Sequence, residues 1–97
     1  MGFKEARALL IEALRAGRFI HEERSDIDEK NLLSAGAVAP AFVIRLLLRC
    51  AGWEYRTSRH HFLDVDCHVF TPTMAGDQWY VKAYLEPGRA VFISVHR

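Results

Sequence analysis

Three stretches in the second half of the chain alternate between apolar and polar residues, a pattern typical of strands with one buried face. They cover residues 63–70, 78–85 and 90–96. Their polar positions are occupied by Asp64, Asp66, His68, Gln78, Tyr80, Lys82, Tyr84, Ser94 and His96. This set is rich in residue types used for proton transfer and anion stabilisation. We therefore expect a candidate site on the polar face of a sheet.

Lys82 stands between two tyrosines in a way that suits nucleic-acid binding. Tyr80 and Tyr84 are each two residues away, so all three side chains are predicted to point to one face of a strand. Aromatic rings beside a cation fit an unstacked base and its phosphate. The alternative is an ordinary solvated sheet face without function.

Asp64, Asp66 and His68 also allow a metal site. Side chains at i, i+2 and i+4 share one strand face, roughly 7 Å apart, and zinc or a hard cation uses such ligands. The chain has no HExxH, paired CxxC, EF-hand loop, GxSxG or Walker A motif. A metal-dependent hydrolase using these three residues is therefore the weaker alternative. The adjacent His60 and His61 are interpreted as surface loop histidines.

The elements that position these residues begin with helices. Apolar residues recur every three or four positions from Phe3 to Leu14, which predicts a helix that ends at Gly17. Residues 22–28 form a charged connector. Asp26 with Glu29 can form a capping box for a short second helix that would run to about Ser34.

A third helix is predicted to begin at Pro40 and to end at Gly52. It is apolar on nearly every side except for Arg45 and Arg49, so it should be the buried helix. Cys50 within it and Cys67 on the apolar sheet face are expected to be inert core thiols, and Trp53 and Trp79 are interpreted first as core residues.

After Gly52 the hydrophobic period changes from 3.6 to 2, and residues 53–59 are a plausible extra strand. PTMAGD and EPG separate the strands as loop and turn sequences. We predict one α+β domain over residues 1–97, with a helical half (1–52) and a sheet half (53–97). Two to three N-terminal helices should pack on the apolar face of a three- to four-stranded, mostly antiparallel sheet.

The 97-residue length allows one hydrophobic core, and the net charge of +1 excludes a strongly basic nucleic-acid-binding protein. The charge is a sum over unlike halves, because the acids of residues 22–29 lie in the helical half, whereas four of the five histidines fall after residue 48. No signal peptide or membrane-spanning segment is predicted, and two cysteines make no disulfide framework. A reduced, cytoplasmic protein is the expectation.

The C-terminal half resembles the MqsR mRNA-interferase toxins of bacterial toxin–antitoxin systems, which have a RelE-like fold. The likeness lies in VFTP at 69–72, YVK at 80–82 and VFISVHR at 91–97, with Tyr55-Arg56 and Ala16-Gly17 upstream. It covers most of the chain and consists of spacing and pattern. It implies an endoribonuclease that acts on mRNA with or without the ribosome, uses no metal or cofactor, and is neutralised by a cognate antitoxin.

The resemblance assigns roles by position. The family's tyrosine falls on Tyr80, and its basic residue after an aromatic falls on Arg56. Its C-terminal lysine falls on or beside His96, and its glutamine in the strand before the proline falls near Cys67 or His68. Histidines therefore stand where better-known members have other side chains, which favours histidine acid–base chemistry or a different target.

Such an enzyme cleaves RNA when the ribose 2′-OH attacks the adjacent phosphate, which requires a base, an acid and cations. His68 and His96 are expected to supply base and acid, because imidazole titrates near neutral pH. Arg56 and Lys82 would hold the phosphate, and Tyr80 would position the nucleotide or donate a hydrogen bond.

A non-catalytic partner-binding or regulatory module of the same fold is the main alternative, and the low net charge favours it. Residues 22–29 and the Arg45/Arg49 stripe are possible docking sites for a partner.

Overall fold

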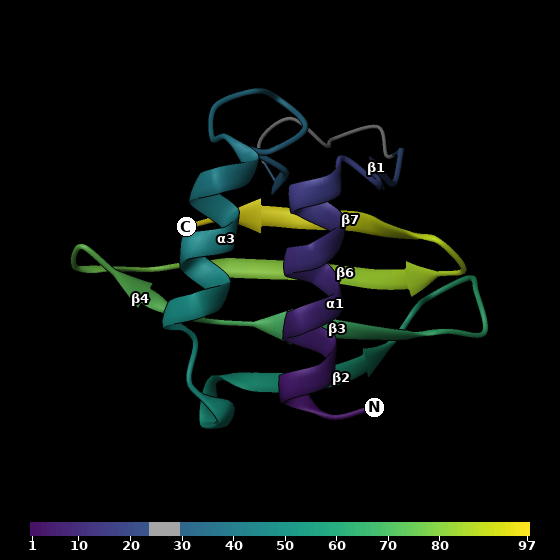
Figure 1. The fold of residues 1–97 in the computed structure, drawn as a ribbon. Helices are drawn as coiled ribbons and strands as arrows, with labels where there is room; N and C mark the ends of the chain where they lie inside the picture. The colour runs from purple at the N-terminus through teal and green to yellow at the C-terminus, as the bar shows by residue number, and fades with distance from the viewer. Residues whose placement is uncertain (24–29) are drawn as a thin grey trace.

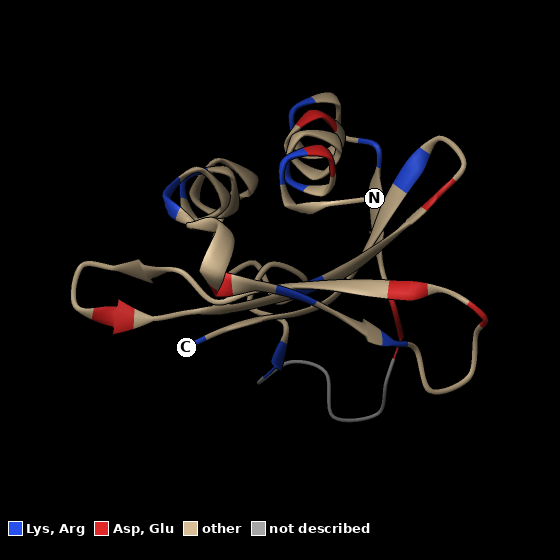
Figure 2. Ribbon diagram, turned by 90° about the horizontal axis from the view of Figure 1, so that it is seen from below, with Lys and Arg blue, Asp and Glu red and all other residues tan. Residues whose placement is uncertain are grey.

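The computed structural model describes residues 1–23 and 30–97 of an α+β protein, the class that the sequence predicts. Helices α1 (Phe3–Ala16) and α3 (Pro40–Arg49) lie side by side on one face of the main sheet, and the opposite face carries no helix in the described part of the chain (Figures 1 and 2). A short 3-10 helix, η1 (Gly52–Glu54), leads into the first long strand.

The main sheet has five strands in the order β1-β7-β6-β3-β2. Every neighbouring pair is antiparallel except β1 and β7, which are parallel. The strands are β1 (Phe19–His21), β2 (Tyr55–Arg59), β3 (Asp66–Phe70), β6 (Tyr80–Glu86) and β7 (Arg89–His96). A separate hairpin consists of β4 (Thr73–Met74) and β5 (Asp77–Gln78). The sheet is therefore wider than the three or four strands predicted.

Two local predictions differ from the structure. Strand β1 is absent from the predicted elements, because three residues are too few to show a period. The predicted second helix lies partly outside the described residues; in its described part Lys30 is helical, and residues 31–34 form a bridge and turns. Asn31 organises this segment: its amide lies 3.2 Å from His21 Nδ1 and 3.5 Å from the Phe92 carbonyl, and its Oδ1 accepts the Ser34 N–H.

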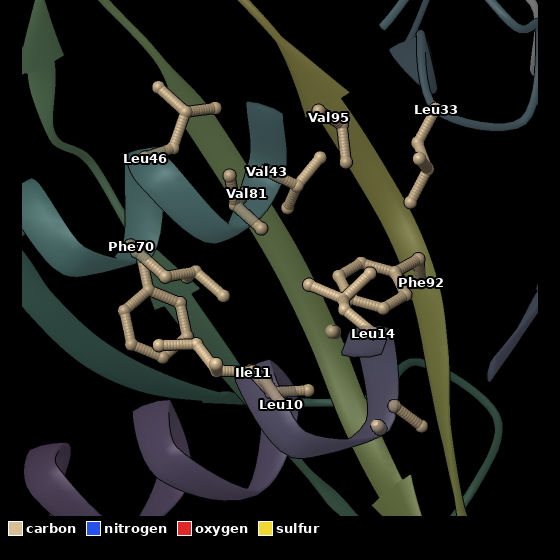
Figure 3. Packing of buried hydrophobic residues seen from close by; sticks show 14 of the residues in the cluster. Leu10, Ile11, Leu14, Leu33, Val43, Leu46, Phe70, Val81, Phe92 and Val95 are labelled. Carbon is tan, nitrogen blue, oxygen red and sulfur yellow. The ribbon is translucent and has the colours of Figure 1, made fainter. Parts of the chain in front are cut away.

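The main core lies between the helices and the sheet (Figure 3). Leu10 and Leu14 from α1, with Val43 from α3, pack towards Phe92 and Val81 on the strands. Their spacing of three to four residues places them on one helix face, and each fully buried side chain contributes about 1.5–3 kcal/mol. Gly17 ends α1 in the left-handed conformation, with φ of 70°, as the sequence predicts.

The assignment of sheet faces from the sequence is wrong for β3. Phe70 packs in the core under the helices, so alternation places His68 and Asp66 on the helix-covered face as well. Cys67 and Val69 then belong to the opposite face, which we call the open face. The register agrees, because His68 pairs with Ala83 of the core, and Val69 pairs with Lys82.

A β-bulge in β7 changes the face of its later residues. Lys82 pairs with Ser94 but Ala83 pairs with Phe92, so Ile93 is the extra residue. As a result Val95 packs under the helices, whereas Val91 and Ile93 join a second cluster on the open face with Cys67 and Tyr84. The prediction that the three apolar β7 residues share one face is therefore wrong.

Candidate functional site

Two of the predicted site residues lie on one row across the open face. Arg56 of β2 pairs with Val69, Val69 pairs with Lys82 of β6, and Lys82 pairs with Ser94 of β7. Neighbouring strands lie about 4.8 Å apart, so the two cationic residues are separated by about 10 Å at the backbone. Arg56 is exposed and Lys82 is half-buried, with the fully buried Val69 between them. Their long side chains can therefore reach one anion above Val69.

Tyr80 and His96 form a stacked pair on the adjacent row of the same face. They are direct cross-strand partners, and their rings are 5.2 Å apart with an interplanar angle of 21°. His96 Nδ1 lies 2.9 Å from the carbonyl oxygen of Arg97. Because a carbonyl only accepts hydrogen bonds, Nδ1 carries the hydrogen and a neutral ring keeps its lone pair on Nε2. His96 is thus held in a tautomer whose Nε2 can take up a proton.

Arg97, which follows β7, is a cation that the sequence pattern does not predict as a site residue. The Arg97 guanidinium lies 5.0 Å from the centre of the Trp79 ring, and Trp79 is buried in the core as predicted. Trp53 contradicts the core interpretation, because it is 84% exposed on η1, three residues before Arg56. No local pattern distinguishes these two tryptophans, because both stand beside polar and apolar neighbours.

His68 does not lie with the other predicted site residues. It is 6% exposed on the helix-covered face, its Nδ1 lies 2.8 Å from the Tyr55 hydroxyl, and the two rings are stacked. Burial lowers the pKa of His68, and the Asp66 carboxylate opposes this shift only in part. Burial, followed by Asp66, raises the pKa of Tyr55. His68 and His96 are therefore on opposite sides of the sheet and do not face one phosphate.

Asp64 and Asp66 form ion pairs with one arginine. The Arg59 guanidinium lies 3.1 Å from Asp66 and also contacts Asp64, and all three side chains are largely exposed. Within residues 1–23 and 30–97, no three His, Cys, Asp or Glu side chains are placed to hold a metal ion. The arrangement does not support the metal-dependent hydrolase that the spacing of Asp64, Asp66 and His68 allows.

His60, interpreted from sequence as a surface residue, is buried. Its Nδ1 accepts the backbone N–H groups of Phe62 and Leu63, both at 3.0 Å, so its Nε2 carries the hydrogen that contacts Glu22. The His60 ring also packs edge-on against Tyr84 at 5.4 Å. Residues 60–65 are thereby held over one end of the open face, and His61 stays exposed.

Tyr84 lies under this covered end, so the predicted Tyr80–Lys82–Tyr84 binding surface is only partly present. Tyr84 is 5% exposed in the second cluster, and its pKa is raised by burial and then by the nearby Glu22 carboxylate. Within the described residues, the accessible part of the open face therefore includes Arg56, Lys82, Tyr80 and His96. Their arrangement can bind a phosphate and offer one imidazole base and one phenol beside it.

Comparison of the chain with protein-family models found no match, and comparisons with curated proteins and with solved structures found none. No helix in the described residues is both long and apolar enough to cross a membrane.

Proposed function

We propose that this chain is a metal-independent endoribonuclease that binds RNA on the open face of its sheet. The observation that carries the proposal is the convergence of Arg56 and Lys82 on one cross-strand row beside the stacked Tyr80–His96 pair. Cations next to aromatic rings suit a phosphodiester and its unstacked base.

The resemblance to the MqsR toxins supports the same activity. The proposal includes a RelE-like fold, action on mRNA in the cytoplasm, and neutralisation by a cognate antitoxin. The family's tyrosine falls on Tyr80, its basic residue after an aromatic falls on Arg56, and its C-terminal lysine falls on or beside His96; these three residues lie on the open face.

In this proposal the reaction is a transesterification. His96 Nε2 takes the proton from the ribose 2′-OH, and the 2′-oxygen forms a bond to phosphorus as the bond to the 5′-oxygen breaks. The Tyr80 hydroxyl donates a proton to the leaving 5′-oxygen. Arg56 binds the non-bridging oxygens through its planar fork, and Lys82 neutralises the charge that develops on them. The products are a 2′,3′-cyclic phosphate and a 5′-hydroxyl end.

One observation favours a second candidate, an RNA-binding module without catalysis. His68 faces the helices, so the accessible face has a single histidine where the sequence suggests an acid–base pair. In this alternative Arg56 and Lys82 bind the backbone, and Tyr80 and His96 serve only as a platform for a base.

Cleavage of a labelled single-stranded RNA in the presence of EDTA tests the proposal. The wild-type chain should cleave, and His96→Gln should slow cleavage about 10²–10⁴-fold, because a general base is removed. RNA affinity, measured by fluorescence anisotropy, should change little in this variant. The double variant Arg56→Gln/Lys82→Gln should weaken affinity and reduce the salt slope of log K by about one for each phosphate that is no longer neutralised.

His61→Gln is the matched control, because His61 is an exposed histidine away from the open-face row. It should cleave like wild type. RNA binding without any cleavage would replace the enzyme with the binding module, and absence of both binding and cleavage would reject both functions.

A further inference from the structure

The outer side of the two helices carries a groove that the open face does not involve. Its first part, about 750 Å³, is lined by α1 residues and by Leu48 of α3. A second part, about 450 Å³, runs from Leu48 to the β4–β5 hairpin at Met74 and Ala75. Leu48, the penultimate residue of α3, belongs to both parts and is 55% exposed. We call this continuous surface the helix groove.

The floor of the helix groove is apolar and its margins are cationic. Ala8, Ile11 and Leu48 are apolar residues that line the first part; Ala8 and Leu48 are exposed, whereas Ile11 is largely buried. The cations along both parts are Lys4, Arg7, Arg15, Arg18, Arg45 and Arg49. Among the described residues that line the two parts, Glu12 is the one carboxylate, and it is paired with Arg18 at 3.0 Å. The groove therefore has an excess of positive charge although the whole chain is nearly neutral.

Several of these cations remain available to a partner. Within residues 1–23 and 30–97, Lys4, Arg15 and Arg49 form no ion pair. Figure 2 shows Lys and Arg positions on both helices. A ligand with carboxylates would complement these positions.

The side chains that line the helix groove distinguish between RNA and an acidic protein helix as the anionic partner. RNA would need aromatic rings on which to stack its bases. The aromatic ring in the groove lining is Phe42, and it already lies against Trp79 at 5.0 Å and under the Arg45 guanidinium at 5.4 Å. Aliphatic Ala8, Ile11 and Leu48 instead offer the surface that an amphipathic helix covers with residues at i, i+3, i+4 and i+7.

We propose that the helix groove is the docking site for an acidic amphipathic helix of a protein partner. The apolar stripe of that helix covers Leu48 and Ile11, and glutamates or aspartates on both sides of the stripe pair with Lys4 and Arg15 along α1 and with Arg49 on α3. This site is separate from the open face and does not depend on RNA cleavage.

A designed peptide tests the site directly. The probe is an N-acetylated, fluorescein-labelled peptide of about 18 residues with leucines at i, i+3, i+4 and i+7 and glutamates beside the stripe. The control peptide has the same composition in an order that breaks the stripe. Fluorescence anisotropy should show that the probe binds at least tenfold more tightly than the control peptide. Added salt should weaken binding of the probe, because salt screens its charge pairs with the groove.

Protein variants locate the binding. Leu48→Asp and the double variant Arg45→Glu/Arg49→Glu should each weaken binding of the probe at least tenfold, and each variant should still show a cooperative thermal unfolding transition because these side chains are exposed. Leu63→Asp is the control for an exposed leucine elsewhere. Arg56→Glu/Lys82→Glu is the control for charge, because it makes the same change in net charge on the open face.

Two results would overturn the proposal. One is equal binding of the two peptides, or probe binding that Leu48→Asp leaves intact. The other is a weaker affinity of Arg45→Glu/Arg49→Glu for single-stranded RNA, which would make the groove a nucleic-acid surface. RNA cleavage by the same preparations is scored separately, so failure of this site and failure of the proposed nuclease are distinguishable.

Discussion

The histidines of this chain differ most in what surrounds each ring. His96 lies half-exposed beside Tyr80, whereas His68 is buried against Tyr55 and His21 is held by the Asn31 amide. For His21 and His68, burial lowers the pKa because the charged imidazolium loses hydration. These two rings are therefore structural in the neutral state, and His96 is the histidine that the open face offers for chemistry.

The lowered pKa values of His21 and His68 predict acid sensitivity. Below about pH 6.5 the unfolded chain takes up protons at these positions while the folded chain does not, so the free energy of unfolding falls as the pH decreases. The contribution of these histidines to the free energy of unfolding is fully present above their pKa in the unfolded chain. It is lost as the pH falls towards their lower pKa in the folded chain. Urea unfolding at pH 7.5, 6.0 and 5.0 measures this slope.

His68→Gln separates the contribution of His68, because glutamine can still accept a hydrogen bond from Tyr55 and does not titrate. The variant should lose less stability than wild type between pH 7.5 and 5.0. An identical pH dependence in both proteins would show that His68 does not couple folding to protonation.

Among the secondary-structure elements, the β4–β5 hairpin contains a local strain. Its two central residues, Ala75 and Gly76, both have positive φ, at 53° and 85°. This geometry matches a type I′ turn, for which Asn-Gly is the preferred sequence. Alanine has no polar side chain to offset the left-handed conformation. The hairpin therefore uses a residue poorly suited to its turn.

Ala75→Asn should raise the free energy of unfolding by about 0.5–1 kcal/mol, because asparagine tolerates the left-handed region better than alanine. Chemical denaturation measures the gain. Ala75→Val is the opposite control and should destabilise, since a β-branched residue is strained at positive φ. Equal stability of the two variants would contradict a type I′ requirement at this position.

Across the molecule as a whole, one contact joins segments that follow the two edge strands. Glu22 follows β1 and His60 follows β2, and these strands are at opposite edges of the five-stranded sheet. Their contact holds residues 60–65 over the second cluster, so only the other end of the open face is accessible.

His60→Ala should lower the free energy of unfolding by about 1–3 kcal/mol, because the buried imidazole is removed and the backbone N–H groups of Phe62 and Leu63 lose their acceptor. Hydrogen exchange at these two amides should become faster. His61→Ala, at the exposed neighbour, should change stability by less than about 0.5 kcal/mol. Unchanged exchange at Phe62 and Leu63 in His60→Ala would contradict this role of the imidazole.

Much of the fold is predictable from local pattern. The helix over Phe3–Ala16, the helix that begins at Pro40 and the EPG turn between β6 and β7 all agree with the structure. Each depends on neighbours within a few residues, such as a 3.6-residue period, a proline in the first turn or a glycine at positive φ. Strand alternation in β6 is equally local, and it correctly places Tyr80 and Lys82 on one face.

Local sequence is thus enough to establish the α+β class, the two helices and the chemical types of the candidate residues, whereas tertiary packing establishes which of those residues meet. Alternation does not say which face of a strand is buried, and a shift of one residue exchanges the faces. Pairing of β3 with β6 therefore separates His68 from Lys82, the bulge at Ile93 redirects β7, and Glu22 reaches His60 through contacts between segments 38 residues apart. Such long-range packing leaves no periodic trace in the sequence, and it reduces the predicted site to Arg56, Tyr80, Lys82 and His96.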